Sequence, residues 1–79
     1  MNIHALYNRF ELITLILFST RERAYFSAGQ KICLHQERAA IMHAIDVINA
    51  DNVSTVTPAY EVPAHINTII NRVQIDLKL

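Results

Sequence analysis

Histidine and cysteine are the residue types in this chain that could bind a metal ion or transfer protons. The four histidines are His4, His35, His43 and His65, and the single cysteine is Cys33. No two histidines have the four-residue spacing at which two imidazoles on one helix share an ion, and Cys33 with His35 lacks a second pair of ligands. We therefore predict no metal site and interpret the histidines as separate side chains on helix surfaces or ends.

Cys33 is also the candidate nucleophile. Nucleophilic catalysis would need a base, an orienting acid and oxyanion donors beside it, and the sequence alone does not place an acid near Cys33 and His35. The neighbouring Ile32 and Leu34 favour a small buried hydrophobe instead. One glycine cannot build a phosphate-binding loop. We expect a protein that is not an enzyme and that needs no cofactor.

The composition is apolar and electrically balanced. Hydrophobic residues make up 52% of the 79 residues, and seven basic residues balance seven acidic ones. This length fits a single domain, residues 1–79, and the balance gives no strong field that would attract nucleic acid or an acidic membrane. One cysteine cannot form an internal disulfide, which favours a reducing, cytoplasmic location. The apolar stretch 12–18 is too short to span a bilayer and lacks the features of a signal peptide.

The first segment has helical periodicity. Apolar residues recur at steps of three and four from Asn2 onward, which predicts one stripe of a helix; they are Ile3, Leu6, Tyr7, Phe10, Ile13, Leu17, Ala24 and Tyr25. Further apolar side chains fall on the other sides of this helix, namely Leu12, Leu15, Ile16 and Phe18. A helix that is apolar nearly all round is buried on both faces, so we predict that these four residues form a homodimer interface. Ser19 and Glu22 have capping-box spacing and could restart a helix.

Gly29 and the polar stretch 49–63 divide the rest of the chain. Residues 31–49 lack Pro and Gly and predict a helix. Its buried side carries Leu34, Ile41, Ala44, Ile45 and Ile48, with Gln36, His43 and Asp46 turned away. Residues 49–52 supply stop signals, and residues 53–57 predict a loop or an edge strand that ends at Pro58.

The third segment has two conflicting patterns. Pro63 suits the first turn of a helix, and an apolar arc then faces a polar one; the arc consists of Ile66, Ile69, Ile70, Val73 and Leu77, opposite Asn67, Asn71, Gln74 and Lys78. Residues 73–79, however, alternate as a half-buried strand does. Ile75 distinguishes the two, because it points outward in a helix and joins the core in a strand. We favour helix through Arg72 and leave the last seven residues open.

These patterns predict a mainly α protein, a small helical domain that forms an intertwined homodimer through an isologous contact. The alternative is an α+β fold with strands near residues 10–18, 25–34 and 73–79 around a central helix.

Arg21, Arg23, Tyr25 and Phe26 are the candidate partner-binding residues. Tyr and Arg anchor many protein interfaces, and here two adjacent rings are flanked by two cations. Basic residues mixed with aromatic ones can also bind nucleic acid. The run from Arg21 to Arg38, however, has a surplus of only two positive charges, whereas useful phosphate binding takes many contacts; its charges are Arg21, Arg23, Lys31 and Arg38 against Glu22 and Glu37. A membrane role would rest on residues 12–18 and is a weaker alternative.

In size, neutrality, apolar surplus and lack of catalytic groups, the chain resembles the small proteins that phages and mobile elements encode to disable another protein, such as antirepressors. That resemblance implies a regulator that acts as an oligomer and occludes a partner protein, for example a transcription repressor. A small nucleic-acid-binding regulator and a purely structural oligomerisation subunit are the alternatives.

Overall fold

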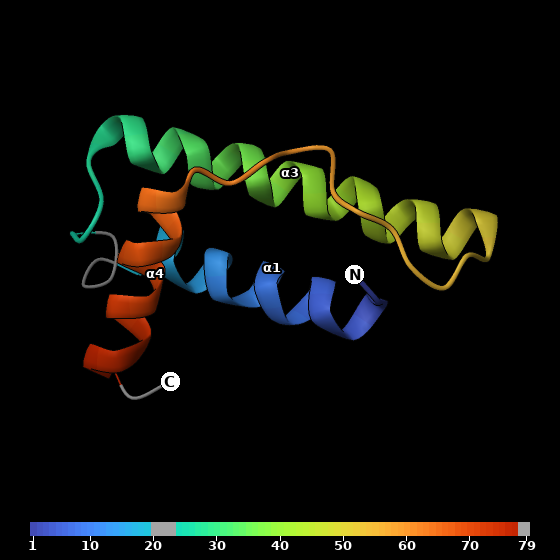
Figure 1. Ribbon diagram of the computed structural model, residues 1–79, viewed down its shortest axis with the longest axis horizontal. Coiled ribbons are helices and arrows are strands. Elements are labelled where there is room, and N and C mark those ends of the chain that lie inside the picture. The colour runs from blue at the N-terminus through green and yellow to red at the C-terminus, as the bar shows by residue number, and fades with distance from the viewer. Residues whose placement is uncertain (20–23, 78–79) are drawn as a thin grey trace.

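The computed structural model describes residues 1–19 and 24–77. They form three helices, α1 (Ile3–Phe18), α3 (Ala28–Asp51) and α4 (Ala64–Leu77). Helices α1 and α3 run antiparallel side by side, and α4 crosses them near the C-terminal end of α1 (Figure 1). The predicted mainly α fold is confirmed. The α+β alternative is wrong for the described residues, which contain no strand: residues 10–18 lie in α1, 25–34 form a turn and the start of α3, and 73–77 lie in α4. Residues 78–79 are outside the described part.

Helix α1 begins and ends at polar residues. The Asn2 side chain accepts a hydrogen bond from the Ala5 amide at 2.9 Å, which satisfies one of the free donors of the first turn. Ser19 has extended backbone angles and closes the helix, with its amide bonded to the Leu15 carbonyl at 3.0 Å. The stripe predicted to run on to Ala24 and Tyr25 therefore stops at Phe18, and those two residues lie in a turn.

Ser19 closes α1, and the predicted capping pair of Ser19 with Glu22 involves residues 20–23, which lie outside the described part of the chain, so it stays a prediction. A capping box is present later in the chain. Ser27 and Gln30, which have the same spacing, form the reciprocal pair at the start of α3. This box carries Gly29 into the first turn of the helix, so the prediction that Gly29 divides two segments is wrong. A Cβ atom at Gly29 would meet nothing within 4 Å.

Helix α3 has the predicted faces and a longer span. Its predicted apolar side is buried and its predicted polar residues are exposed. The helix ends where the polar stretch predicted a stop, because Asn52 adopts the left-handed conformation, with φ 54°. Residues 53–63 then form a loop, tied to the N-terminus by two backbone bonds between Met1 and Val56 of 3.0 and 3.1 Å.

Helix α4 starts just after Pro63, whose carbonyl accepts the Ile66 amide at 3.0 Å. The helix continues through the alternating residues to Leu77. Ile75 is 75% exposed, as the helical alternative requires, whereas Ile70 and Val73 are fully buried. The arc of apolar residues at helical spacing therefore outweighs the local alternation, because it packs against the rest of the bundle.

One hydrophobic cluster joins the three helices. It is built from the apolar stripes of α1, α3 and α4 with one ring from the turn before α3; its members are Leu6, Ile13, Ile16, Leu17, Phe26, Leu34, Ile41, Ala44, Ile45, Ile48, Ile66, Ile70 and Val73. This core fixes which sides of α1 and α3 face α4 and which remain open.

Candidate protein-binding surface

Arg38 of α3 is held against three side chains of α1. Its Nε donates to Thr14 Oγ1 at 3.0 Å, and its guanidinium carbon lies 4.6 Å from the ring centre of Phe10 and 5.6 Å from that of Phe18. Phe10, Thr14 and Phe18 follow one another at four-residue steps, so they share one face of α1. The cation is therefore placed over two aromatic rings, an arrangement that attracts it to their negative faces.

This arrangement is open to solvent. Phe18 is 68% exposed, Met42 is 46% exposed one turn beyond Arg38, and Arg38 itself is half-buried. The hydrogen bond to Thr14 occupies only the Nε of Arg38, and no carboxylate among the described residues pairs with this arginine. Within residues 1–19 and 24–77, its terminal NH2 groups therefore have no acidic partner. We call Phe10, Thr14, Phe18, Arg38 and Met42 the open flank.

Two further side chains of α3 lie on the same side as the open flank. Lys31 and His35 precede Arg38 by seven and three residues, which places them on the same side of α3. His35 is exposed and Lys31 half-buried. Lys31 and Arg38 make this side of α3 basic at neutral pH.

The opposite side of the α1–α3 pair is closed by α4. Arg9 Nε donates to Glu37 Oε2 at 2.7 Å, and Arg9 Nη2 donates to Glu37 Oε1 at 3.1 Å and to Asn67 Oδ1 of α4 at 2.8 Å. The Glu37 side chain is only 7% exposed, so the paired fork and its hydrogen bonds compensate the loss of water around the carboxylate. We call Arg9, Glu37 and Asn67 the closed flank.

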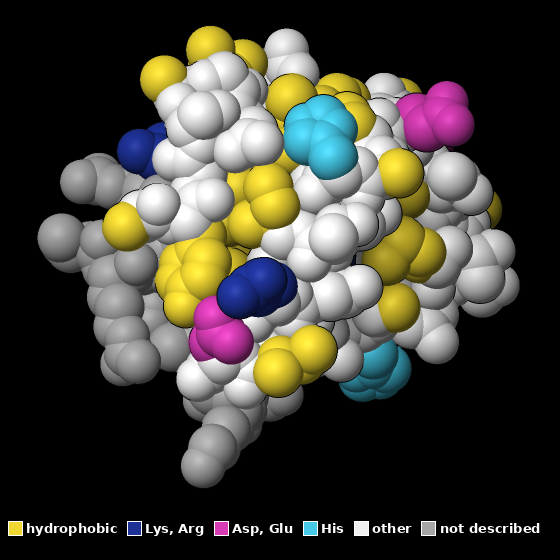
Figure 2. Space-filling view, turned by 60° about the vertical axis from the view of Figure 1, so that its left-hand side comes forward, with side chains coloured by type: hydrophobic (Ala, Val, Ile, Leu, Met, Phe, Trp, Pro, Cys, Tyr) yellow, Lys and Arg dark blue, Asp and Glu magenta, His cyan; other side chains and the backbone are white. Residues whose placement is uncertain are grey.

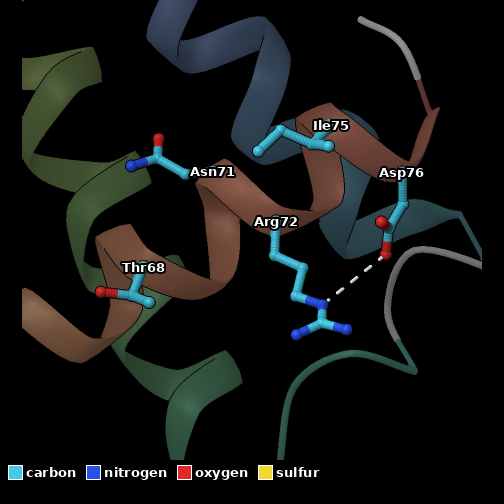
Figure 3. Close-up of a pocket in the computed structure, with 5 residues that line it drawn as sticks. All are labelled: Thr68, Asn71, Arg72, Ile75 and Asp76. Atoms are coloured by element: carbon cyan, nitrogen blue, oxygen red, sulfur yellow. Dashed lines mark ion pairs between the residues drawn. The ribbon is translucent and has the colours of Figure 1, made fainter.

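The outer face of α4 carries an open hollow of about 450 Å³. Among the described residues, five side chains of this helix line it (Figure 3): Thr68, Asn71, Arg72, Ile75 and Asp76. Asp76 Oδ2 accepts a hydrogen bond from the Tyr25 hydroxyl at 2.9 Å and lies 4.0 Å from Arg72 Nε. Figure 2 brings this end of the molecule forward and shows hydrophobic side chains around an adjacent basic and acidic pair.

The predicted partner-binding residues do not form one surface in the described part of the chain. Arg21 and Arg23 lie outside the described residues. Phe26 is 4% exposed and belongs to the core, whereas Tyr25 is 37% exposed and bonds to Asp76. A ring beside basic residues in sequence can thus be a core ring, because the turn before α3 points Phe26 inward.

The predicted dimer residues divide into two pairs. Ile16 is fully buried within the single chain and Leu12 packs against the core, while Leu15 is 45% and Phe18 68% exposed. Within the single chain, the hydrophobic cluster covers Ile16 and part of Leu12. An interface on α1 would therefore use Leu15 and Phe18.

Sequence reasoning missed both arginine arrangements. From the sequence, Arg38 was counted only as one charge of a basic run. The four-residue spacing of Phe10, Thr14 and Phe18 nevertheless indicated that these three residues share one face of a helix. The closed flank had no local signal in the sequence, because Arg9 is 28 positions from Glu37 and 58 positions from Asn67.

The histidines and Cys33 do not converge on a site in the described structure. All four histidines are exposed. Within residues 1–19 and 24–77, no group of three or more His, Cys, Asp or Glu side chains could hold a metal ion. The half-buried Cys33 hydrogen-bonds to Tyr60, and this bond, burial, and negative charge at Cys33 and Glu37 raise the pKa of the Tyr60 hydroxyl above its ordinary value of 10.0.

Comparisons with known proteins give no relative for this chain. No family model matches it, and no curated protein and no solved structure matches it either. Among the described residues, no helix is both long and apolar enough to cross a membrane.

Proposed function

We propose that this chain is a non-catalytic regulator that binds another protein through the open flank. The observation that carries the proposal is the placement of Arg38, which lies over Phe10 and Phe18 with no carboxylate partner among the described residues. Arginine and aromatic residues are enriched at the centres of protein interfaces. A preorganised guanidinium loses little conformational freedom when a partner binds it.

The chemistry of the open flank defines the partner segment. A carboxylate would pair with the terminal NH2 groups of Arg38, and apolar side chains would cover Phe18 and Met42, which are 68% and 46% exposed. Binding of such an acidic, apolar segment would occlude it from its own ligand. Action by occlusion is the mechanism that the antirepressor resemblance implies.

The charges of the described residues favour a protein partner over nucleic acid. Glu37 neutralises Arg9, and Asp76 lies one turn from Arg72. Among the described residues, Lys31 and Arg38 remain as cations without an acidic neighbour, and two phosphate contacts supply little affinity at physiological salt.

Site-specific photo-crosslinking in the native host tests this proposal. A photoreactive phenylalanine at position 18 should form a covalent adduct with one protein, whereas the same group in place of Asp46, an exposed residue of α3 outside the open flank, should not. The purified partner should then bind Arg38→Gln about tenfold more weakly than wild type, because a charged interface contact is lost.

Asp46→Asn is the matched control in that titration, since it also removes one exposed charge from α3. Equal affinities for wild type and Arg38→Gln would contradict the proposal. The absence of an adduct at position 18 above the level at position 46 would contradict it as well.

A further inference from the structure

Ile75 is an apolar side chain on the wrong side of α4 for the core. It is 75% exposed, more than any other large hydrophobic residue that the structure describes. Ile66, Ile70 and Val73 occupy the opposite arc of the helix and are buried. Most of the Ile75 side chain therefore makes no packing contact among the described residues, and contact with another apolar surface would bury it favourably.

The hollow beside Ile75 has the geometry of a packing site for a helix. Thr68, Asn71, Arg72 and Ile75 line it at positions i, i+3, i+4 and i+7 of α4 (Figure 3). Four residues at this spacing form the hole that accepts one apolar knob from a facing helix. The side chains of Thr68 and Asn71 are short, so a second helix can approach closely.

The charges at the hollow are of opposite sign and one turn apart. Arg72 Nε lies 4.0 Å from Asp76 Oδ2, at the outer limit of an ion pair, and the two side chains are 77% and 41% exposed. Such an exposed pair contributes little to the stability of the chain. The Tyr25 hydroxyl holds Asp76 in place at 2.9 Å, while Arg72 can turn towards another acid.

We propose that the outer face of α4 binds a second copy of this chain, with the two α4 helices antiparallel about a two-fold axis. Ile75 of each copy enters the hollow of the other, centred between Asn71 and Arg72. In that register Arg72 lies opposite a point about one and a half residues, roughly 2 Å, from the partner's Asp76, so apolar and ionic contacts form together. A parallel arrangement would instead place the two Arg72 guanidinium groups side by side. The inference goes beyond the proposed function, which gives α4 no role, and it assigns the predicted homodimer a surface on α4.

The size of α4 sets the strength of this contact. Two helices of 14 residues, about 21 Å long, cover less than the roughly 1,600 Å² of a standard stable interface. The dimer is therefore reversible and forms as the protein concentration rises. It leaves the open flank of both copies uncovered, since Arg38 and Phe18 belong to α3 and α1.

Sedimentation velocity over a range of concentrations tests the dimer. Wild type should shift from monomer to dimer, and Ile75→Ser should weaken association at least tenfold with an unchanged circular dichroism spectrum, because Ile75 lies outside the core. Asp46→Arg, a charge change on the exposed side of α3, should associate as wild type does. A monomer at every concentration, or a dimer that tolerates Ile75→Ser, would overturn the proposal.

Charge reversal tests the antiparallel register. Arg72→Asp alone and Asp76→Arg alone should each associate more weakly than wild type, because each homodimer then brings like charges together. A mixture of these two variants should recover association, since both cross-pairs in the mixed dimer have opposite charges. Failure of the mixture to recover would overturn the register.

Crosslinking at position 18 reports separately on the proposed function. Loss of dimerisation in Ile75→Ser with retained crosslinking through position 18 shows that the two surfaces act independently. Retained dimerisation without any adduct at position 18 would contradict partner binding and leave the α4 contact supported.

Discussion

The two flanks of the α1–α3 pair hold one arginine each, and the two arginines have opposite surroundings. Arg9 is bound to a buried carboxylate and to Asn67 of α4, whereas Arg38 lies over two rings at the surface. Consecutive residues of a helix project about 100° apart, so Glu37 and Arg38 fall on either side of the buried stripe of α3. The closed flank therefore joins the three helices, and the open flank stays open to solvent.

The difference shows that the position of one carboxylate determines the role of each arginine. Glu37 faces α4, where water is excluded, and a charge there needs its partner. Arg38 has no carboxylate on its own side among the described residues, so its charge interacts with ring faces and solvent. We therefore expect the two flanks to differ in what a substitution does: changes in the closed flank should mainly affect stability, and changes in the open flank should mainly affect the proposed binding.

The largest expected effect distinguishes the closed side of α1 from its exposed side. Ile16→Ala should lower the free energy of unfolding by about 3 kcal/mol, because it leaves a cavity in a fully buried site. The neighbouring Leu15→Ala should change it by less than about 1 kcal/mol, since Leu15 is 45% exposed. Urea denaturation of both variants at low protein concentration measures the difference. Equal losses would show that Leu15 is as covered as Ile16.

The next effect compares two adjacent residues of α3. Glu37→Ala should cost roughly 3 kcal/mol of stability, at the low end for a broken buried pair because Arg9 keeps 21% of its side chain exposed. Arg38→Ala should cost about 1 kcal/mol, the value of a surface cation–π contact with one hydrogen bond.

The double variant Arg9→Met with Glu37→Met controls for the unpaired charge in that experiment. It should recover most of the stability lost in Glu37→Ala, because an apolar pair leaves no buried charge alone. Thermal and urea unfolding provide the comparison. A double variant as unstable as Glu37→Ala would mean that the hydrogen bond to Asn67 carries the effect.

The smallest expected effect is on the pKa of Tyr60, to which Glu37 of the closed flank also contributes. The raised pKa of Tyr60 means that the fold favours the neutral phenol, chiefly through the hydrogen bond to Cys33. Its contribution to stability is complete below about pH 10, the unfolded pKa, and is lost as the pH rises towards the folded value. Tyrosinate absorbance compared with Tyr60→Phe isolates this titration.

Cys33→Ala should lower the pKa of Tyr60, because it removes both the hydrogen bond and the nearby negative charge. Ile32→Ala is the matched control, because Ile32 is adjacent in sequence and 58% exposed. Leu34→Ala would not serve, since Leu34 is buried in the core. An unchanged Tyr60 titration in Cys33→Ala would leave burial and Glu37 as the causes.

Helical faces were predictable from sequence, and helix ends were only partly so. The buried side of α3 followed from the spacing of Leu34, Ile41 and Ile48, because a core selects residues at the period of the helix. The end of α1 at Phe18 was not predictable from the sequence, since apolar residues continue at helical steps to Tyr25. The capping residues decided both boundaries, and Ser27 with Gln30 outweighed the break expected at Gly29.

The candidate site was less predictable than the fold. Pairing of Arg38 with Phe10 and Phe18 depends on the register between α1 and α3, which no local pattern specifies. Ile75 was different: the helical pattern placed it outside the core, and the structure places it there. Single exposed apolar residues on an otherwise well-defined amphipathic helix are thus the part of a binding surface that sequence can indicate.

Gly29 offers a practical route to all of these measurements. It lies inside a helix at ordinary backbone angles with open space where a methyl group would go, and alanine is favoured over glycine there by up to about 1 kcal/mol, partly because the unfolded chain becomes stiffer. A Gly29→Ala parent protein would therefore tolerate disruptive second changes better than the natural sequence. Variants too fragile to purify could be studied in that background without altering either side of the helix pair.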